Sequence, residues 1–359
     1  MPEISYTAER FNAFPPTGKL LPGQVGVTAT GSEMVSFAEV CAYAASVGDV
    51  GILGMQPRRP ANELLWRRLM VRSSLTTHMG HFAKSRSYKR LDPSEKSAVS
   101  YFLGMAQCAA MADKVLGVRA TVHVDSLIKL LGRRLPRRSR PDLVGFAVPP
   151  TSRNTLGRFL LEAKGRTHQF SASTVESALE QLRNPPAVVR NLVGVNSVHA
   201  ASLAYFEPLV RRGTPVWHSH LEDPPPDDQS PVSELSDSEF RGVVLIAQLL
   251  PIQRAIADIR ATDDGRQFEE QHGLTGAELP GTGAHVAIPT NLYTLLERID
   301  GPLSDPAARE ALASQVWEAT RSDYSPDALL AAVGGEGEIA TLGSGLSFAE
   351  VRVEQQIEG

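Results

Sequence analysis

Two short β-prone segments, RPDLVGFAV at residues 140–148 and GRFLLEAKG at residues 157–165, constrain the fold of this chain more than any other feature. The stretch between them is rich in Pro, Ser, Thr and Asn, which is typical of a turn, so we expect an antiparallel hairpin. Side chains alternate between faces along a strand, which puts Glu162 and Lys164 on one face. A hairpin centred in the intervening stretch places Asp142 opposite a position between them.

The segments on either side of this hairpin predict a mixed α/β unit. Helical spacing is strongest over residues 92–117, where Asp92 is the expected N-cap, Pro93 the first helical residue and Glu95 the third. The β-prone ATVHVDSL precedes the hairpin, and the helical STVESALEQLR and the β-prone VVRNLVGVNSV follow it. The predicted order is therefore helix, three strands, helix and strand.

An Asp, a Glu and a Lys gathered at one patch suit phosphodiester hydrolysis. Two neighbouring carboxylates with open positions for water and a substrate phosphate match the oxygen shell that Mg²⁺ prefers, with Mn²⁺ as the alternative ion. The ion would polarise the phosphodiester and lower the pKa of bound water. Lys164 would position the attacking water and offset negative charge in the transition state. The competing interpretation is a cross-strand salt bridge of modest energy.

The motif RPDLVGF, followed twenty residues later by LLEAKGR, resembles the PD-(D/E)xK nuclease superfamily, whose core is restriction-endonuclease-like. The resemblance covers residues 92–221, about a third of the chain, and it implies the core order α-β-β-β-α-β. It also implies that Asp142 and Glu162 bind the metal, that the carbonyl of Ala163 joins them, and that Lys164 is catalytic.

The same resemblance extends to the two flanking helices and to function. It implies a catalytic glutamine on the second helix, where Gln181 fits, and an acid on the first helix, for which Glu95 is the candidate. A capping box explains Glu95 without chemistry and is the favoured interpretation. The implied activity is that of a metal-dependent endonuclease, a hydrolase acting on DNA in restriction or antiviral defence. The alternative is an inactive nuclease-fold module that binds DNA or a protein partner.

Charge is distributed unevenly and favours a nucleic-acid partner. The net charge is -4, but residues 118–212 hold fifteen Lys or Arg against six Asp or Glu, so this segment carries +9 and the remainder -13. Clustered guanidinium groups bind backbone phosphates, although such a block is often only a solvated loop. The candidate phosphate-binding residues are Arg133, Arg134, Arg137, Arg138, Arg140 and Arg166.

The rest of the chain divides by composition. Residues 1–91 are predicted to be a mainly helical N-terminal region, and residues 222–239 a Pro-rich, acidic linker. Residues 240–359 are predicted to form a separate α+β region, with Pro251 breaking or kinking its first helix. The acidic C-terminal region is expected to bind a protein partner, to form an oligomer such as a homodimer, or to cap the core.

Two further patterns bear on location and metal binding. The two cysteines are expected to be buried thiols, and the longest apolar run, GVVLIAQLL, is about half a membrane span, so we expect a cytoplasmic protein without a membrane partner. The stretch HSHLED resembles the HxHxDH pattern of metallo-hydrolases, but Glu222 and Asp223 stand where that pattern has Asp and His. Packed or solvated histidines are the favoured interpretation of His218 and His220.

Overall fold

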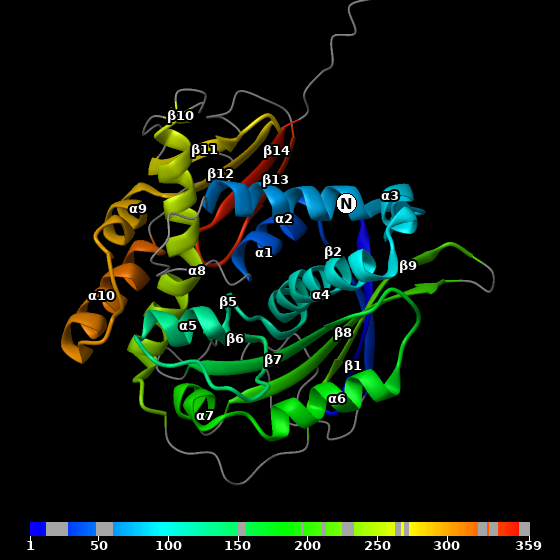
Figure 1. The fold of residues 1–359 in the computed structure, drawn as a ribbon, viewed down its shortest axis with the longest axis horizontal. Helices are drawn as coiled ribbons and strands as arrows, with labels where there is room; N and C mark the ends of the chain where they lie inside the picture. Colours follow the sequence, from blue (N-terminus) through cyan, green and yellow to red (C-terminus); the bar gives the residue numbers. More distant parts are fainter. Residues whose placement is uncertain are drawn as a thin grey trace, which may run out of the picture.

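The computed structural model describes residues 1–11, 28–47, 60–148, 156–194, 197–209, 213–224, 233–262, 267–268, 273–321, 329 and 337–351. A nine-stranded mixed sheet and a five-stranded sheet are covered by helices (Figure 1). The predicted mixed α/β class is therefore confirmed.

The larger sheet runs in the order β2 (Ala29–Met34), β1 (Glu3–Glu9), β4 (His81–Lys84), β9 (Pro215–Glu222), β8 (Val198–Pro208), β7 (Gly157–Gly165), β6 (Leu143–Ala147) and β5 (Ala120–His123), and β3 (Leu75–His78) pairs with β4. The smaller sheet runs in the order β10 (Gln267–Phe268), β11 (Leu274–Leu279), β12 (Ala284–Pro289), β14 (Ser347–Val351) and β13 (Gly337–Thr341). The helices are α1 (Phe37–Ser46), α2 (Pro60–Ser74), α3 (Arg86–Arg90), α4 (Pro93–Leu116), α5 (Val124–Leu130), α6 (Ala172–Arg183), α7 (Ala187–Val193), α8 (Asp237–Arg260), α9 (Thr290–Glu297) and α10 (Pro306–Ala319).

The strands from β5 to β9 form the part of the sheet that carries the predicted site. β5, β6 and β7 pair antiparallel, β8 runs parallel to β7, and β9 returns antiparallel to β8. A parallel neighbour requires a crossover connection, and α6 with α7 supplies it. Figure 1 shows α4 on one face of these strands and α6 on the other.

Helix α4 begins and ends where the sequence indicates. Asp92 accepts hydrogen bonds from the N–H groups of Ser94 and Glu95, and Glu95 reaches back to the Asp92 N–H, which completes a capping box. Gly117 ends the helix with φ at 70°, a left-handed conformation that glycine adopts without a Cβ clash. The predicted cap at Asp92 is confirmed.

The predicted hairpin is present, and its register is one residue away from the expected one. Leu143 pairs with Leu161 and Gly145 with Phe159. Continuing that register by one residue brings Asp142 opposite Glu162, and the expected position was between Glu162 and Lys164.

Two segments that the sequence predicts as strands are partly helical instead. ATVHVDSL forms the short strand β5 and then α5, because the ring nitrogen Nδ1 of His123 accepts the N–H of Asp125 and caps the helix. VVRNLVGVNSV contributes most of α7, which ends at Gly194 with φ at 74°, before β8 starts. Both helices are only seven residues long and are rich in Val and Leu, residues that suit either element.

The regions outside residues 92–221 share sheets and a buried core with the residues inside that range. Strands β1 to β4 from the N-terminal region join the larger sheet, so that region is not only helical. Helix α8 contacts β5 and β6 of the larger sheet as well as β11 and β12 of the smaller one. One buried cluster runs through all of these elements. The domain limits stay a prediction.

Helix α8 passes through Pro251 without ending, so no break occurs there, and the alternative of a kink stays a prediction. The residues around Pro251 are buried, and burial of this apolar helix outweighs the lost backbone hydrogen bond. The helix is long and apolar enough to span a membrane, but 83% of its most apolar window is buried inside the protein. Cys41 and Cys108 are buried free thiols, as expected.

Candidate functional site

The structure brings Glu162 and Lys164 of β7 together on the face that α6 covers. The Lys164 ammonium group donates one hydrogen bond to Glu162 Oε1 and one to Gln181 Oε1, the latter at 2.6 Å. Gln181, on α6, donates in turn to Ser139 Oγ at 2.6 Å. The glutamine therefore holds the lysine beside the carboxylate and ties both to the Arg-rich loop before β6.

Asp142 lies at the start of β6, next to the same pair. Its Oδ2 accepts the N–H of Ala163 at 3.0 Å, and its Oδ1 accepts the hydroxyl of Tyr101 at 3.4 Å. Tyr101 belongs to α4, so three elements meet at this carboxylate. Asp142, Glu162, Lys164 and Gln181, which the sequence assigned to one site, are thus adjacent.

Glu162 is the most buried member of this cluster, and one of its two carboxylate oxygens lacks a hydrogen bond. The side chain is 1% exposed, and among the described residues its Oε2 atom has no hydrogen-bond partner. Burial, followed by the negative charge of Asp142, raises the pKa of Glu162 to about 8, against the opposing effect of Lys164. Burial also raises the pKa of Asp142, although the Ala163 N–H and the charges of His123 and Lys164 oppose it.

This donor set fits a divalent cation. The buried carboxylate of Glu162 and the partly buried one of Asp142 share a single nearby ammonium group, so their combined charge is not neutralised when both are ionised. A buried polar atom without a partner is costly, and the Glu162 Oε2 atom is such an acceptor. Hard oxygen ligands of this kind are those that Mg²⁺ and Mn²⁺ prefer.

The backbone beside the lysine is fixed by a close approach of α4 to β7. A Cβ atom on Gly165 would lie 1.7 Å from the Ser100 carbonyl oxygen, and one on Gly104 would lie 2.8 Å from the Gly165 nitrogen. Only glycine fits at this contact. The helix that carries Tyr101 is thereby held against the strand that carries Lys164.

The Arg-rich loop is partly engaged within the protein. Arg140 forms a two-pronged ion pair with Asp125, and Arg133 pairs with Glu234 at 2.6 Å. Arg166 donates to Thr174 Oγ1 at 2.5 Å. The remaining predicted phosphate-binding residues, Arg134, Arg137 and Arg138, are exposed.

Glu95 does not join the cluster through any contact that the structure records. Its carboxylate accepts the Asp92 N–H at 2.9 Å in the capping box, and the residue is exposed. The capping interpretation of Glu95 accounts for its position in the first turn of α4.

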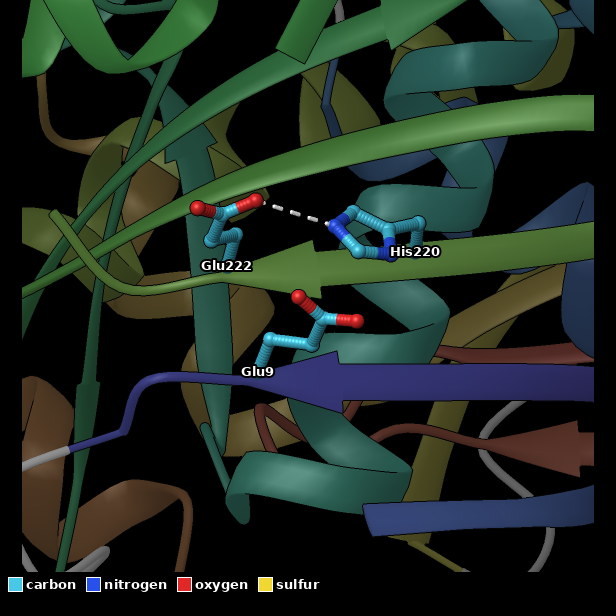
Figure 2. A group of neighbouring side chains, drawn as sticks. All are labelled: Glu9, His220 and Glu222. Atoms are coloured by element: carbon cyan, nitrogen blue, oxygen red, sulfur yellow. Dashed lines mark hydrogen bonds and ion pairs between the residues drawn. The ribbon is translucent and has the colours of Figure 1, made fainter. Parts of the chain in front are cut away.

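A second polar cluster, which we call the His220 cluster, consists of Glu9, His220 and Glu222 (Figure 2). One ligand atom from each residue lies within 4.8 Å of the others. His220 Nε2 is 3.1 Å from Glu222 Oε2, and Arg10 forms an ion pair with Glu222 at 3.0 Å. His218 is not part of the cluster.

The sequence did not predict three residues that contribute to the two clusters. Tyr101 and Ser139 contact predicted site residues, but a tyrosine on an amphipathic helix and a serine in a loop carry no distinctive signal. Glu9 reaches His220 and Glu222 only because β1 pairs with β9. The pair of His220 and Glu222 was visible as alternate residues of one strand, and that spacing was the available signal.

Comparisons with protein-family models, with curated proteins and with solved structures find no match to this chain.

Proposed function

We propose that the chain is a metal-dependent nuclease that hydrolyses phosphodiester bonds in DNA at Asp142, Glu162 and Lys164. The observation that carries the proposal is the buried, partnerless Oε2 atom of Glu162 beside a second carboxylate and a lysine. A salt bridge alone would need one carboxylate, and it would leave no buried acceptor without a partner.

The surrounding fold supports the same proposal. The strands β5 to β8, with α4 before them and α6 between β7 and β8, follow the order that the resemblance to PD-(D/E)xK nucleases implies, with α5 and α7 as additions. The finer restriction-endonuclease-like assignment is part of this proposal. A setting in restriction or antiviral defence follows from that resemblance.

Each residue of the cluster has a role that its contacts suggest. Asp142 and Glu162, together with the carbonyl of Ala163, would hold Mg²⁺ or Mn²⁺. The bound ion would polarise the phosphodiester and offset charge on the leaving oxygen. Lys164 donates hydrogen bonds from a position 27% exposed, so its ammonium group can reach a water or a phosphate oxygen at the surface. Gln181 positions that lysine.

The approach to this cluster favours a polyanionic substrate. The loop containing Arg134, Arg137 and Arg138 leads directly into the strand that starts after Asp142, and Ser139 of that loop is hydrogen-bonded to Gln181. Exposed guanidinium groups at such a place would neutralise phosphates of the nucleic-acid backbone.

A cleavage assay tests the proposal. The full chain is incubated with supercoiled plasmid, double-stranded and single-stranded oligonucleotides, with Mg²⁺, with Mn²⁺ or with EDTA. Asp142→Ala and Lys164→Ala variants run in parallel, and Lys129→Ala, outside the cluster, is the matched lysine control. We expect metal-dependent cleavage by the unaltered chain and by the control. Cleavage that persists in both site variants contradicts the assignment, and metal-independent binding of DNA without cleavage favours the inactive module.

A further inference from the structure

The His220 cluster lies on the same face of the sheet as the proposed nuclease site, but on other strands. Glu162 is in register with Ala201 of β8, Ala201 with Glu222 of β9, and Glu222 with Glu9 of β1. Residues in register on paired strands project to the same face. Strands lie about 4.8 Å apart, so Glu162 and Glu222 are about 10 Å apart along this row.

That separation makes the His220 cluster independent of the nuclease site. Two ions that act on one phosphate lie about 3.5–4 Å apart, less than half of the spacing here. Ala201, which stands between the two clusters, offers no side-chain ligand. The His220 cluster therefore does not complete the site at Asp142 and Glu162.

The geometry of the His220 cluster suits one metal ion. Two ligand atoms that each lie about 2.1 Å from an ion are separated by at most about 4.2 Å. The three ligand atoms already lie within 4.8 Å of one another, so small side-chain movements suffice. In Figure 2 the carboxylate of Glu9 points toward the space between His220 and Glu222.

The negative charge of the cluster is also not fully balanced, which favours binding of a cation. Glu222 has partners in Arg10 and His220. Glu9 has no side-chain hydrogen bond or ion pair to any other residue that the structure describes, although it is partly buried. Two carboxylates with one arginine carry a net charge of -1, which a divalent cation would reverse, and an imidazole that binds a metal is neutral.

The surroundings hold His220 in place for such a role. Its ring packs edge-on against Phe170, with ring centroids 5.0 Å apart, and its side chain is 6% exposed. His218, two residues earlier on the same face, is engaged elsewhere: its Nε2 lies 3.2 Å from the Glu207 carbonyl oxygen, and its ring stacks on Tyr205.

We propose that Glu9, His220 and Glu222 form a second metal site, which takes a divalent transition-metal ion such as Zn²⁺. An imidazole with two carboxylates favours Zn²⁺ and related ions over Mg²⁺, which is bound mainly by oxygen ligands. The site joins the N-terminal strand β1 to β9, two strands that are distant in the sequence. It goes beyond the proposed nuclease function and does not depend on it.

Calorimetric titration of the tag-free, EDTA-treated full chain with Zn²⁺ tests this proposal, and Co²⁺ absorption in the visible range supplies a spectroscopic readout. Glu9→Gln and His220→Asn remove one ligand each, and His218→Asn is the matched control on the same strand and face. We expect one Zn²⁺ per chain in the unaltered protein and in the control. Affinity should fall at least about 10-fold in both ligand variants.

Thermal unfolding separates loss of a ligand from loss of the fold. Zn²⁺ should raise the Tm of the unaltered chain and not that of Glu9→Gln. Because Glu9 is only partly buried, that variant decides the question if His220→Asn does not fold. Zn²⁺ binding that is absent from the unaltered chain, or unchanged in Glu9→Gln, overturns the proposal. Asp142→Asn distinguishes the two sites, because its Zn²⁺ affinity should match that of the unaltered chain.

Discussion

Two clusters of acidic residues share one face of the larger sheet, and the chain assembles them by different means. Asp142, Glu162 and Lys164 come from a single hairpin and are brought together by local pairing. Glu9 and Glu222 come from strands that are far apart in sequence and meet only through the pairing of β1 with β9. Local clusters can be deduced from spacing, whereas the second kind requires the whole sheet.

The clusters also differ in how their charge is balanced. In the His220 cluster Glu222 has an arginine and a histidine as partners, and the carboxylate without a described partner is that of the partly buried Glu9. Glu162 is more deeply buried and keeps one oxygen without a partner. Without a cation, the cluster of Asp142, Glu162 and Lys164, which we call the hairpin cluster, thus has the less favourable electrostatic energy. We expect this cluster to be the catalytic one.

The rate of DNA cleavage should distinguish the two clusters most strongly. Asp142→Asn is expected to lower the rate of Mg²⁺-dependent DNA cleavage by at least about 1,000-fold, because it removes a charged ligand from the ion that the reaction needs. Glu9→Gln should leave the rate within about threefold, since distant sites act independently. Single-turnover rates on a plasmid measure both. Equal losses in the two variants would show that the clusters form one site.

The second prediction concerns the packing that supports only the hairpin cluster. Gly165→Ala should lower the free energy of unfolding by about 3 kcal/mol, because the new Cβ would collide with the Ser100 carbonyl and push α4 away from β7. Gly301→Ala is the control, since its Cβ would meet no atom within 4 Å. Urea unfolding measures the difference. Similar stabilities for the two variants would contradict this view of the α4 contact.

The third prediction follows from the raised pKa of Glu162. In the unfolded chain a glutamate loses its proton near pH 4.3, but in the folded chain the pKa of Glu162 is about 8. The folded state holds the proton more tightly, so this contribution to stability is complete below about pH 4 and is lost as the pH rises through 8. In EDTA, the free energy of unfolding of Glu162→Gln, relative to that of the unaltered chain, should rise on the order of 4 kcal/mol between pH 5 and pH 9.

Urea unfolding at the two pH values provides the measurement, and Glu9→Gln serves as the comparison from the other cluster. A stability difference for Glu162→Gln that is the same at pH 5 and pH 9 would mean that Glu162 is ionised throughout this range.

The smallest expected effect concerns Gln181. Gln181→Ala removes the hydrogen bond that holds the Lys164 ammonium group and should lower kcat about 10-fold, with little change in KM, because the lysine remains but is less well positioned. Gln181→Glu offers a matched acceptor and should recover part of the rate. A larger loss than that of Lys164→Ala would assign Gln181 a role beyond positioning.

The sequence was sufficient for features determined by local chemistry. The capping box at Asp92 and the hairpin around Asp142 and Glu162 follow from residue types at fixed spacings, and both are present. Gln181 was placed beside Lys164 through the resemblance, and the two are in contact.

Features determined by tertiary packing could not be deduced in this way. Short apolar segments such as α5 and α7 suit a helix or a strand, and their neighbours decide between the two. Burial keeps α8 helical through Pro251, against its local preference. The partners of Arg133 and Arg140, and the position of Glu9 beside His220, depend on contacts between distant segments.

The most direct measurement of the central claim is the proton released when Mg²⁺ binds. At pH 7 a carboxyl group with a pKa of about 8 is mostly protonated, so a cation at Asp142 and Glu162 must displace that proton. Calorimetric titrations of the full chain in buffers of different ionisation enthalpy report the number released. We expect about 0.9 proton per Mg²⁺ for the unaltered chain and none for Glu162→Gln. Mg²⁺ binding without proton release, unaffected by Asp142→Asn, would contradict the claim.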